Sequence, residues 1–263
     1  MCVLVPRVTS LTRNDSDYIP RSFSDFSLQP GRTNSFLIRT RAPLALRYLD
    51  DSPLERHHAS VGLSLLEKHR ILATLEPGER SEVCASFVSA ILATDMSQHA
   101  SLLSRLRARV AAEKAAVVRA ARGLAAAAPD AAPAPSAAAG PTAPAHGLAA
   151  GSVEDRRLLV AYLLHAADLH TPLLPHPLSR RVAASLDVEF AAQAFSERAL
   201  GLSVSVMLPS SAAAKARNEL GFLRAVVKPL YATLAELAPP LRPCIARVDA
   251  NERAWAAAVG GEP

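Results

Sequence analysis

One stretch of the sequence constrains the fold more than any other, because its apolar residues recur at the spacing of an α-helix. Val83, Phe87 and Ile91 follow one another at steps of four, and the apolar stripe runs from Glu82 to about Leu103. A stripe of this width must face a core. Alanine and leucine are abundant, whereas the alternating runs of β-branched residues that predict strands are hard to find. We therefore expect an all-α fold.

Length and composition exclude several classes of protein. With 263 residues, of which 50% are apolar and 20% charged, the chain can bury a sizeable core in one domain or at most two, and it is neither disordered nor fibrous. No uninterrupted apolar run is long enough to cross a membrane, and the first ten residues lack the apolar centre of a signal peptide. Cys2, Cys84 and Cys244 are too scattered for a disulfide framework or a zinc knuckle. We expect a soluble, cytoplasmic protein.

The net charge of +5 raises the question of nucleic-acid binding. The densest basic group lies on one alanine-rich predicted helix, without interleaved aromatic residues: Arg105, Arg107, Arg109, Lys114, Arg119 and Arg122. Without a recognisable nucleic-acid-binding motif, such a group is typical of a solvent-exposed helix face. We therefore expect no nucleic-acid partner.

Changes in composition divide the chain. Residues 1–29 are polar without a sustained period, which predicts a disordered leader. Residues 30–259 form the predicted helical domain, and residues 260–263 are a tail. Residues 124–150 interrupt the domain with 14 alanines and 5 prolines in 27 residues, and prolines at this density predict a flexible insertion because they cannot lie inside a helix. Further helices are expected at about 60–67, 154–168, 179–200, 212–237 and 243–259.

Short catalytic motifs are missing: the sequence has no nucleophile elbow, phosphate-binding loop, dinucleotide-binding loop or zinc-protease motif. Neighbouring residues on a helix point about 100° apart, so His57 and His58 are poor joint ligands for one metal ion. His165 and Asp168 lie three residues apart and share a helix face. Spacing alone leaves both a functional site and ordinary core or capping roles open for this pair.

Several segments, taken in order, resemble the catalytic domain of class I 3′,5′-cyclic nucleotide phosphodiesterases. The matching strings are residues 30–38 (PGRTNSFLI), 48–58 (YLDDSPLERHH), 91–99 (ILATDMSQH), 165–172 (HAADLHTP) and 189–202 (EFAAQAFSERALGL), followed by Gly221-Phe222, residues 228–230 and residues 251–255. The resemblance covers about Pro30 to Val259. It implies a compact multi-helix phosphodiesterase-type domain that lacks its N-terminal helices. It also implies the family reaction, metal-dependent hydrolysis of cyclic AMP or cyclic GMP to the 5′-monophosphate in signal transduction.

The same resemblance implies a site with two divalent metals, zinc together with magnesium or manganese. In this family the metals activate a bridging water and clamp the phosphate, while a histidine protonates the departing 3′ oxygen. By position, Asp168 resembles a zinc ligand. Glu55 and Thr94 resemble the residues that hold the waters of the second metal.

The metal site departs from the family pattern. Residues 25–29 (DFSLQ) stand where the family has a histidine-aspartate pair and a further histidine, and no histidine precedes His57, so the general-acid histidine is also absent. One carboxylate cannot hold a catalytic zinc, which takes about three protein ligands. We therefore expect the chain as written to be inactive.

Three interpretations remain open. In the first, the N-terminal residues come from a mispredicted exon or an alternative start that is joined to a genuine phosphodiesterase domain. In the second, the chain is a non-catalytic pseudoenzyme that binds a nucleotide or a partner. The third is a purely structural all-α interaction protein. Nucleotide binding distinguishes the last two.

The resemblance also implies a purine pocket with changed residues. Glu219 stands where the family has a glutamine that meets the base edge, and Phe222 stands at the aromatic clamp. Phe190 is the expected opposite wall, and Thr171 replaces an asparagine. The expected apolar lining is Leu169, Leu186, Met96 and Met207. Because an ionised glutamate only accepts hydrogen bonds, Glu219 favours the amino group of adenine over the O6 of guanine, but the preference between cyclic AMP and cyclic GMP stays open.

Overall fold

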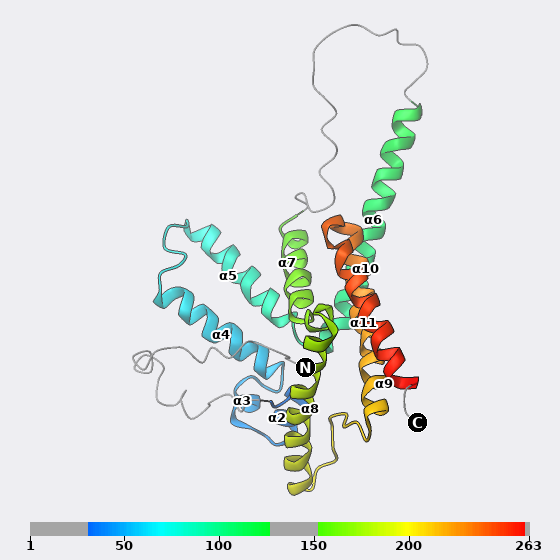
Figure 1. Ribbon diagram of the computed structural model, residues 1–263. Coiled ribbons are helices and arrows are strands. Elements are labelled where there is room, and N and C mark those ends of the chain that lie inside the picture. Colours follow the sequence, from blue (N-terminus) through cyan, green and yellow to red (C-terminus); the bar gives the residue numbers. More distant parts are fainter. Residues whose placement is uncertain (1–30, 127–151, 261–263) are drawn as a thin grey trace.

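The computed structural model describes residues 31–126 and 152–260, and every regular element in these two ranges is helical (Figure 1). The α-helices are α2 (Asn34–Arg39), α3 (Pro43–Arg47), α4 (Pro53–Lys68), α5 (Pro77–Leu92), α6 (His99–Ala126), α7 (Val153–Asp168), α8 (His176–Ala199), α9 (Ala212–Phe222), α10 (Lys228–Leu237) and α11 (Arg242–Gly260). Short helical turns are η2 (Met96–Gln98), η3 (Thr171–Leu173), η4 (Leu223–Val227) and η5 (Pro239–Leu241). The all-α prediction is confirmed. The predicted leader at 1–29, most of the insertion at 124–150 and nearly all of the tail lie outside the described residues.

The apolar stripe that suggested one long element is split between two helices. α5 ends at Leu92, and α6 starts at His99 after the turn η2. The Thr94 hydroxyl donates to the Ile91 carbonyl at 2.8 Å, and the Asp95 carboxylate accepts from the Ser97 N–H at 2.8 Å. The prediction of a continuous stripe to Leu103 was wrong because these side chains compete with the backbone for its helical hydrogen bonds.

Other boundaries differ by a few residues. α4 starts at Pro53, seven residues before the predicted start, because a proline is well suited to the first helical position. α6 continues through Ala126, into the segment expected to be a flexible insertion, since the first proline there is Pro129 and alanine favours helix. Between α9 and α10 the predicted helix at 212–237 passes through the π-helical turn η4.

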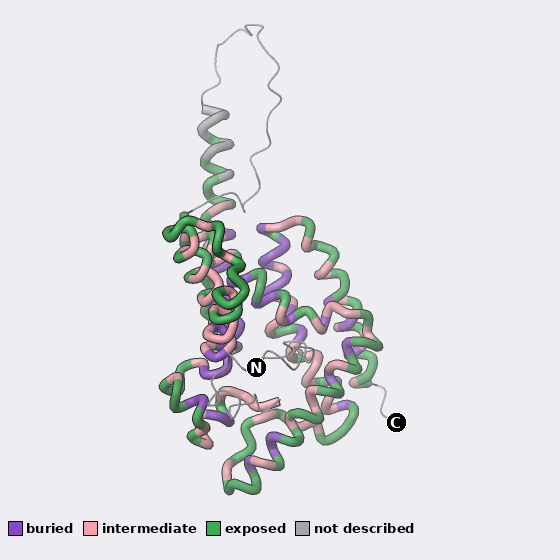
Figure 2. The backbone as a smooth tube through the Cα atoms, turned by 90° about the vertical axis from the view of Figure 1, so that its left-hand side faces the viewer, coloured by how far each residue is buried: buried purple, intermediate pink, exposed green. Residues whose placement is uncertain are grey.

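The main core lies where α6, α7, α10 and α11 meet. Its large, fully buried side chains include Leu106, Tyr162, Leu230 and Leu234. The Tyr231 hydroxyl donates to the Ala166 carbonyl at 2.6 Å, which joins α10 to the end of α7. Figure 2 shows buried stretches alternating with exposed ones along the helices, as expected for helices with one face on a core.

A smaller core joins α2, α3 and the start of α4, where Phe36, Leu37 and Leu54 pack together. This N-terminal part is held against α8 by polar contacts. The Thr33 N–H donates to Gln193 Oε1 at 2.9 Å, and the Arg32 guanidinium donates to Ser196 Oγ at 2.8 Å. Segments about 160 residues apart in the sequence are therefore in direct contact.

The far end of α6 projects beyond the other helices (Figure 1). The basic residues of α6 are exposed except for Arg109, which is half-buried beside Asp155 at 3.4 Å. Lys114 pairs with Glu236 at 2.5 Å. The arrangement agrees with a solvated helix face. In the two described ranges, no helix is long and apolar enough to cross a membrane.

Candidate functional site

Two of the predicted site positions lie in a buried carboxylate cluster between α2, α4 and η2. Glu55, in the first turn of α4, is fully buried and accepts from Asn34 Nδ2 at 2.7 Å. The same Asn34 amide lies 3.5 Å from Asp95 Oδ2, which also accepts from the Ser52 hydroxyl at 2.7 Å. Thr94 is buried beside Asp95 at the end of α5, but its hydroxyl is directed to its own helix. The cluster thus brings the Glu55 and Thr94 positions together.

The carboxylates of this cluster differ in electrostatics. Burial raises the pKa of Glu55, against the opposing effect of the hydrogen bond from Asn34. Burial would also raise the pKa of Asp95, but hydrogen bonds from the Ser97 N–H and the Ser52 hydroxyl outweigh it and hold that pKa below its usual value. Glu55 Oε1 has no hydrogen-bond partner among the described residues.

Asp168, the predicted zinc ligand, is the last residue of α7 and is half-buried. Burial, together with the nearby Glu55 carboxylate, raises the pKa of Asp168 to about 7. The two carboxyl groups are therefore close enough to influence each other across the space between α4 and α7.

His165 does not act together with Asp168, although the two share a face of α7. Its Nε2 lies 2.9 Å from His99 Nδ1, and both rings are buried. Burial lowers the pKa of His165 to about 4, helped by the neighbouring His99, and burial also lowers the pKa of His99. Both rings are neutral at pH 7, with one donating and the other accepting. His165 is a paired core histidine, which is the alternative that spacing left open.

The described residues do not form a metal site. In 31–126 and 152–260, no three side chains of histidine, cysteine, aspartate or glutamate lie together so that they could hold a metal ion. Asn34 donates to one oxygen of Glu55, and Ser52 and Ser97 donate to the two oxygens of Asp95. Of these four carboxylate oxygens, Glu55 Oε1 alone has no partner among the described residues. The donor set falls short of the three protein ligands that a catalytic zinc takes.

The predicted base-recognition residues lie on one face of α9. Glu219 and Phe222 are half-buried and three residues apart, so they are neighbours on the helix. One turn earlier, Lys215 Nζ forms an ion pair with Asp187 of α8. Burial raises the pKa of Glu219, Lys215 lowers it, and Asp187 raises it. The ion pair shows that this part of α8 faces α9.

The remaining predicted lining residues are distributed around α8 and the turns beside it. Leu186 and Phe190 are half-buried on α8, next to Asp187. Leu169 is buried in the main core, and Met96 packs against that core. Thr171 begins η3 and is half-buried. Met207, in the connection after α8, is 66% exposed, so the structure does not bring it into an apolar lining.

Comparison with known proteins identifies the protein family of this chain. A sequence model of the family described as 3′5′-cyclic nucleotide phosphodiesterase matches residues 28–248. The chain belongs to the 3′,5′-cyclic nucleotide phosphodiesterase family. The family is one of hydrolases, and its members generally use divalent metal ions.

Curated relatives of this phosphodiesterase chain include the mouse 3′,5′-cyclic-AMP phosphodiesterase 4C and the 3′,5′-cyclic-AMP phosphodiesterase, isoform F, of Drosophila melanogaster. Each is 32% identical over 213 residues, which are 80% of this chain. The match spans only 27% and 28%, respectively, of those relatives. Among solved structures, the phosphodiesterase domain of the RhoPDE fusion protein from the choanoflagellate Salpingoeca rosetta matches with a TM-score of 0.71 and 28% identity, over 88% of this chain and 64% of that chain.

Sequence analysis missed residues that join distant helices of this chain. Asn251, on α11, is buried and donates to the Pro172 and Leu174 carbonyls at 2.5 and 2.8 Å. These bonds fix η3, which follows the end of α7 that carries Asp168. In the sequence, Asn251 was noted only as part of the matching segment 251–255. No local pattern indicated that its hydrogen-bond partners lie more than 70 residues away.

A second missed group fixes the connection after α8. The buried Glu197 carboxylate accepts from the Ser205 N–H at 2.9 Å and lies 3.3 Å from Arg39 of α2. Gln193, one turn earlier on α8, donates to Thr33 Oγ1 at 3.1 Å. The string at 189–202 indicated that these residues matter, but their partners are set by the packing of α2 against α8.

Proposed function

We propose that this chain acts on 3′,5′-cyclic nucleotides, and that α8 and α9 bind the purine. The observation that carries the proposal is that a half-buried carboxyl group, Glu219, and a half-buried aromatic ring, Phe222, lie together on one face of α9. The ion pair between Lys215 of α9 and Asp187 of α8 brings α8 next to α9. A planar base needs an aromatic face on which to stack and a polar group at its edge, and this face of α9 supplies both.

Glu219 sets the expected base preference. When ionised, its carboxylate accepts from the exocyclic amino group of adenine and repels the O6 of guanine. Because burial raises the pKa of Glu219, lower pH gives it a proton to donate and weakens this discrimination. We therefore expect cyclic AMP to bind in preference to cyclic GMP, most clearly at higher pH, where Glu219 is ionised. The names of the curated relatives, which are cyclic-AMP phosphodiesterases, support the same order.

For the family reaction, hydrolysis to the 5′-monophosphate, Asp168 is the carboxylate that would bind zinc, with Glu55 and Thr94 near the second metal, magnesium or manganese. Relatives named phosphodiesterases support the reaction class. The ligand set in the described residues is incomplete, so we derive no catalytic step for this chain.

A second candidate is binding without hydrolysis, and one observation favours it. The described ranges contain no three-residue metal-binding group. In this role the helical domain binds the cyclic nucleotide or a partner without hydrolysis.

The test combines binding and turnover on the full chain. Thermal unfolding is followed with millimolar cyclic AMP or cyclic GMP, because a ligand that binds only the folded state raises the unfolding midpoint. Glu219→Ala should abolish the shift by cyclic AMP, and Glu219→Gln should admit both nucleotides. Arg217→Ala, an exposed change on the same helix, should keep the wild-type shift. No shift with either nucleotide would refute the proposal.

Turnover then separates the two candidates. Release of AMP is measured with zinc and magnesium or manganese added. Nucleotide binding with no turnover supports the non-catalytic role, whereas turnover that is lost in Asp168→Asn supports hydrolysis.

A further inference from the structure

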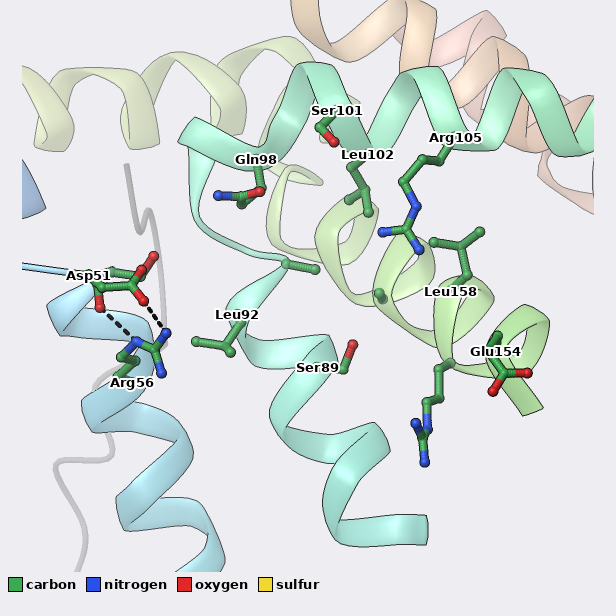
Figure 3. Close-up of a pocket in the computed structure, with 14 residues that line it drawn as sticks. Asp51, Arg56, Ser89, Leu92, Gln98, Ser101, Leu102, Arg105, Glu154 and Leu158 are labelled. Carbon is green, nitrogen blue, oxygen red and sulfur yellow. Dashed lines mark hydrogen bonds and ion pairs between the residues drawn. The ribbon is translucent and has the colours of Figure 1, made fainter. Parts of the chain in front are cut away.

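A cavity of about 390 Å³ lies between the N-terminal end of α4, the C-terminal half of α5, the start of α6 and the start of α7 (Figure 3). Its size is in the range of small-molecule sites. None of the predicted metal or purine residues lines it. It adjoins the carboxylate cluster at Ser52, which donates to Asp95 and also lines the cavity.

One wall of the cavity is a stripe of hydrogen-bond donors on α6. Gln98 lies just before the first residue of α6, and Ser101 and Arg105 follow at helical spacing, so the three side chains share a face. In Figure 3 the Arg105 side chain extends from α6 toward α7 and ends beside Leu158. Ser89 of α5 adds a hydroxyl to the lining.

Arg105 is the lining cation that is available to a ligand. The other two lining arginines are already in ion pairs: Arg56 with Asp51, and Arg157 with Glu82. Arg105 has no hydrogen-bond or ion-pair partner among the described residues.

Asp51 and Glu82 neutralise Arg56 and Arg157, so Arg105 and Glu154 supply the remaining charges of the lining. Three arginines and two carboxylates, Asp51 and Glu154, line the cavity. Hydrogen bonds from its own backbone N–H and from Ser152 lower the pKa of Glu154, so it is ionised, and Arg157 and Arg156 add to this effect. Glu154 therefore disfavours a ligand that carries negative charge at both ends.

The floor of the cavity is apolar. Leu92 of α5, Leu102 of α6 and Leu158 of α7 line it, and Leu102 is also part of the buried core. A ligand that is only an inorganic anion would leave this surface in contact with water, whereas an apolar body would cover it.

We propose that this cavity binds a small organic anion with one charged end, whose phosphate or carboxylate group is held by Arg105, Ser101 and Gln98 and whose apolar body lies on Leu92, Leu102 and Leu158. A guanidinium presents parallel N–H donors that match both a phosphate and a carboxylate, so these two groups share one mode of recognition. The site is independent of nucleotide binding between α8 and α9.

The test uses three probes of similar shape on the full chain: phenyl phosphate, benzoate and uncharged benzyl alcohol. Binding is measured by ligand-observed NMR and calorimetry. We expect the two anions to bind and benzyl alcohol to bind at least tenfold more weakly. Binding by phenyl phosphate and not benzoate assigns the site to phosphate esters, and the reverse assigns it to carboxylates.

Two variants keep the test specific. Arg105→Met should weaken binding of the anions about tenfold or more, since a charge-assisted contact contributes on this scale. The matched control Arg107→Met changes an exposed arginine of the same helix that does not line the cavity, and it should bind as the wild type does. Ser101→Trp should block the cavity from an exposed position. Unchanged affinity in Arg105→Met, equal losses in both arginine variants, or equal binding of benzyl alcohol would overturn the proposal.

Discussion

Replacement of Asn251 tests whether the α11 contact holds η3 in place. The Nδ2 group of Asn251 donates to two carbonyl oxygens, of Pro172 at 2.5 Å and of Leu174 at 2.8 Å, and the side chain is 3% exposed. Asn251→Ala removes both donors and leaves the Pro172 carbonyl buried without them. Each hydrogen bond contributes about 1 kcal/mol net, and an unsatisfied buried carbonyl adds about 1–3 kcal/mol. We expect the free energy of unfolding to fall by about 3–5 kcal/mol.

Asn251→Asp separates hydrogen bonding from side-chain volume. The carboxyl group has nearly the same shape, but its ionised form cannot donate and would face two carbonyl oxygens. Burial therefore raises the pKa of the new carboxyl group above its unfolded value of about 3.9. A raised folded-state pKa means that stability is retained below the unfolded pKa and lost as pH rises through the folded pKa. Each unit of upward shift adds about 1.4 kcal/mol to the deficit at neutral pH.

Urea unfolding measures both variants against the wild type at about pH 5 and pH 8. Trp255, the single tryptophan of the chain, lies one turn from Asn251 and reports the unfolding of α11 by fluorescence. The deficit of Asn251→Asp should grow from pH 5 to pH 8, whereas that of Asn251→Ala should stay constant. Arg253→Ala, an exposed change two residues away, should change stability by less than about 0.5 kcal/mol. A deficit below that value for Asn251→Ala, or a pH-independent deficit for Asn251→Asp, would refute the reasoning.

Two further predictions concern α4 and α7. Gly62→Ala should destabilise the chain by up to about 2 kcal/mol, because a Cβ there overlaps the Phe87 ring. Overpacking costs about 1–3 kcal/mol, and the gain in helix propensity offsets about 1 kcal/mol of it. Urea unfolding should show rescue by an added Phe87→Leu, and a stabilised single variant would contradict this. The pKa of Asp168 is about 7 in the folded chain and about 3.9 in the unfolded chain, so its ionisation costs stability progressively as pH rises from about 4 to about 7. Asp168→Asn should therefore raise the unfolding midpoint relative to the wild type more at about pH 8 than at about pH 4, and an equal effect at both pH values would exclude this origin.

The sequence by itself determined the helical class and most helix positions. The spacing of apolar residues shows which residues share one face of a helix, and the scarcity of alternating patterns argues against strands. Both signals are local, so they do not depend on how the helices pack. The sequence also determined the family, because strings such as 91–99 and 165–172 occur in order, and residues 28–248 match the family as a whole.

Local spacing failed wherever side chains competed with the backbone or met distant partners. The stripe after Val83 gave no sign that Thr94 and Asp95 interrupt it, because their effect depends on single hydrogen bonds rather than on periodicity. His165 and Asp168 share a face of α7, yet the partner of His165 is His99, which lies 66 residues earlier.

Only the tertiary structure decided which polar residues form clusters and which surfaces enclose space. Asn34 reaches Glu55 and Asp95, and Asn251 reaches η3, because helices far apart in the sequence cross at particular angles. The cavity beside Arg105 arises from four helices at once. Periodicity specifies the inward face of each helix, but the partner of that face is set by how all the helices pack together.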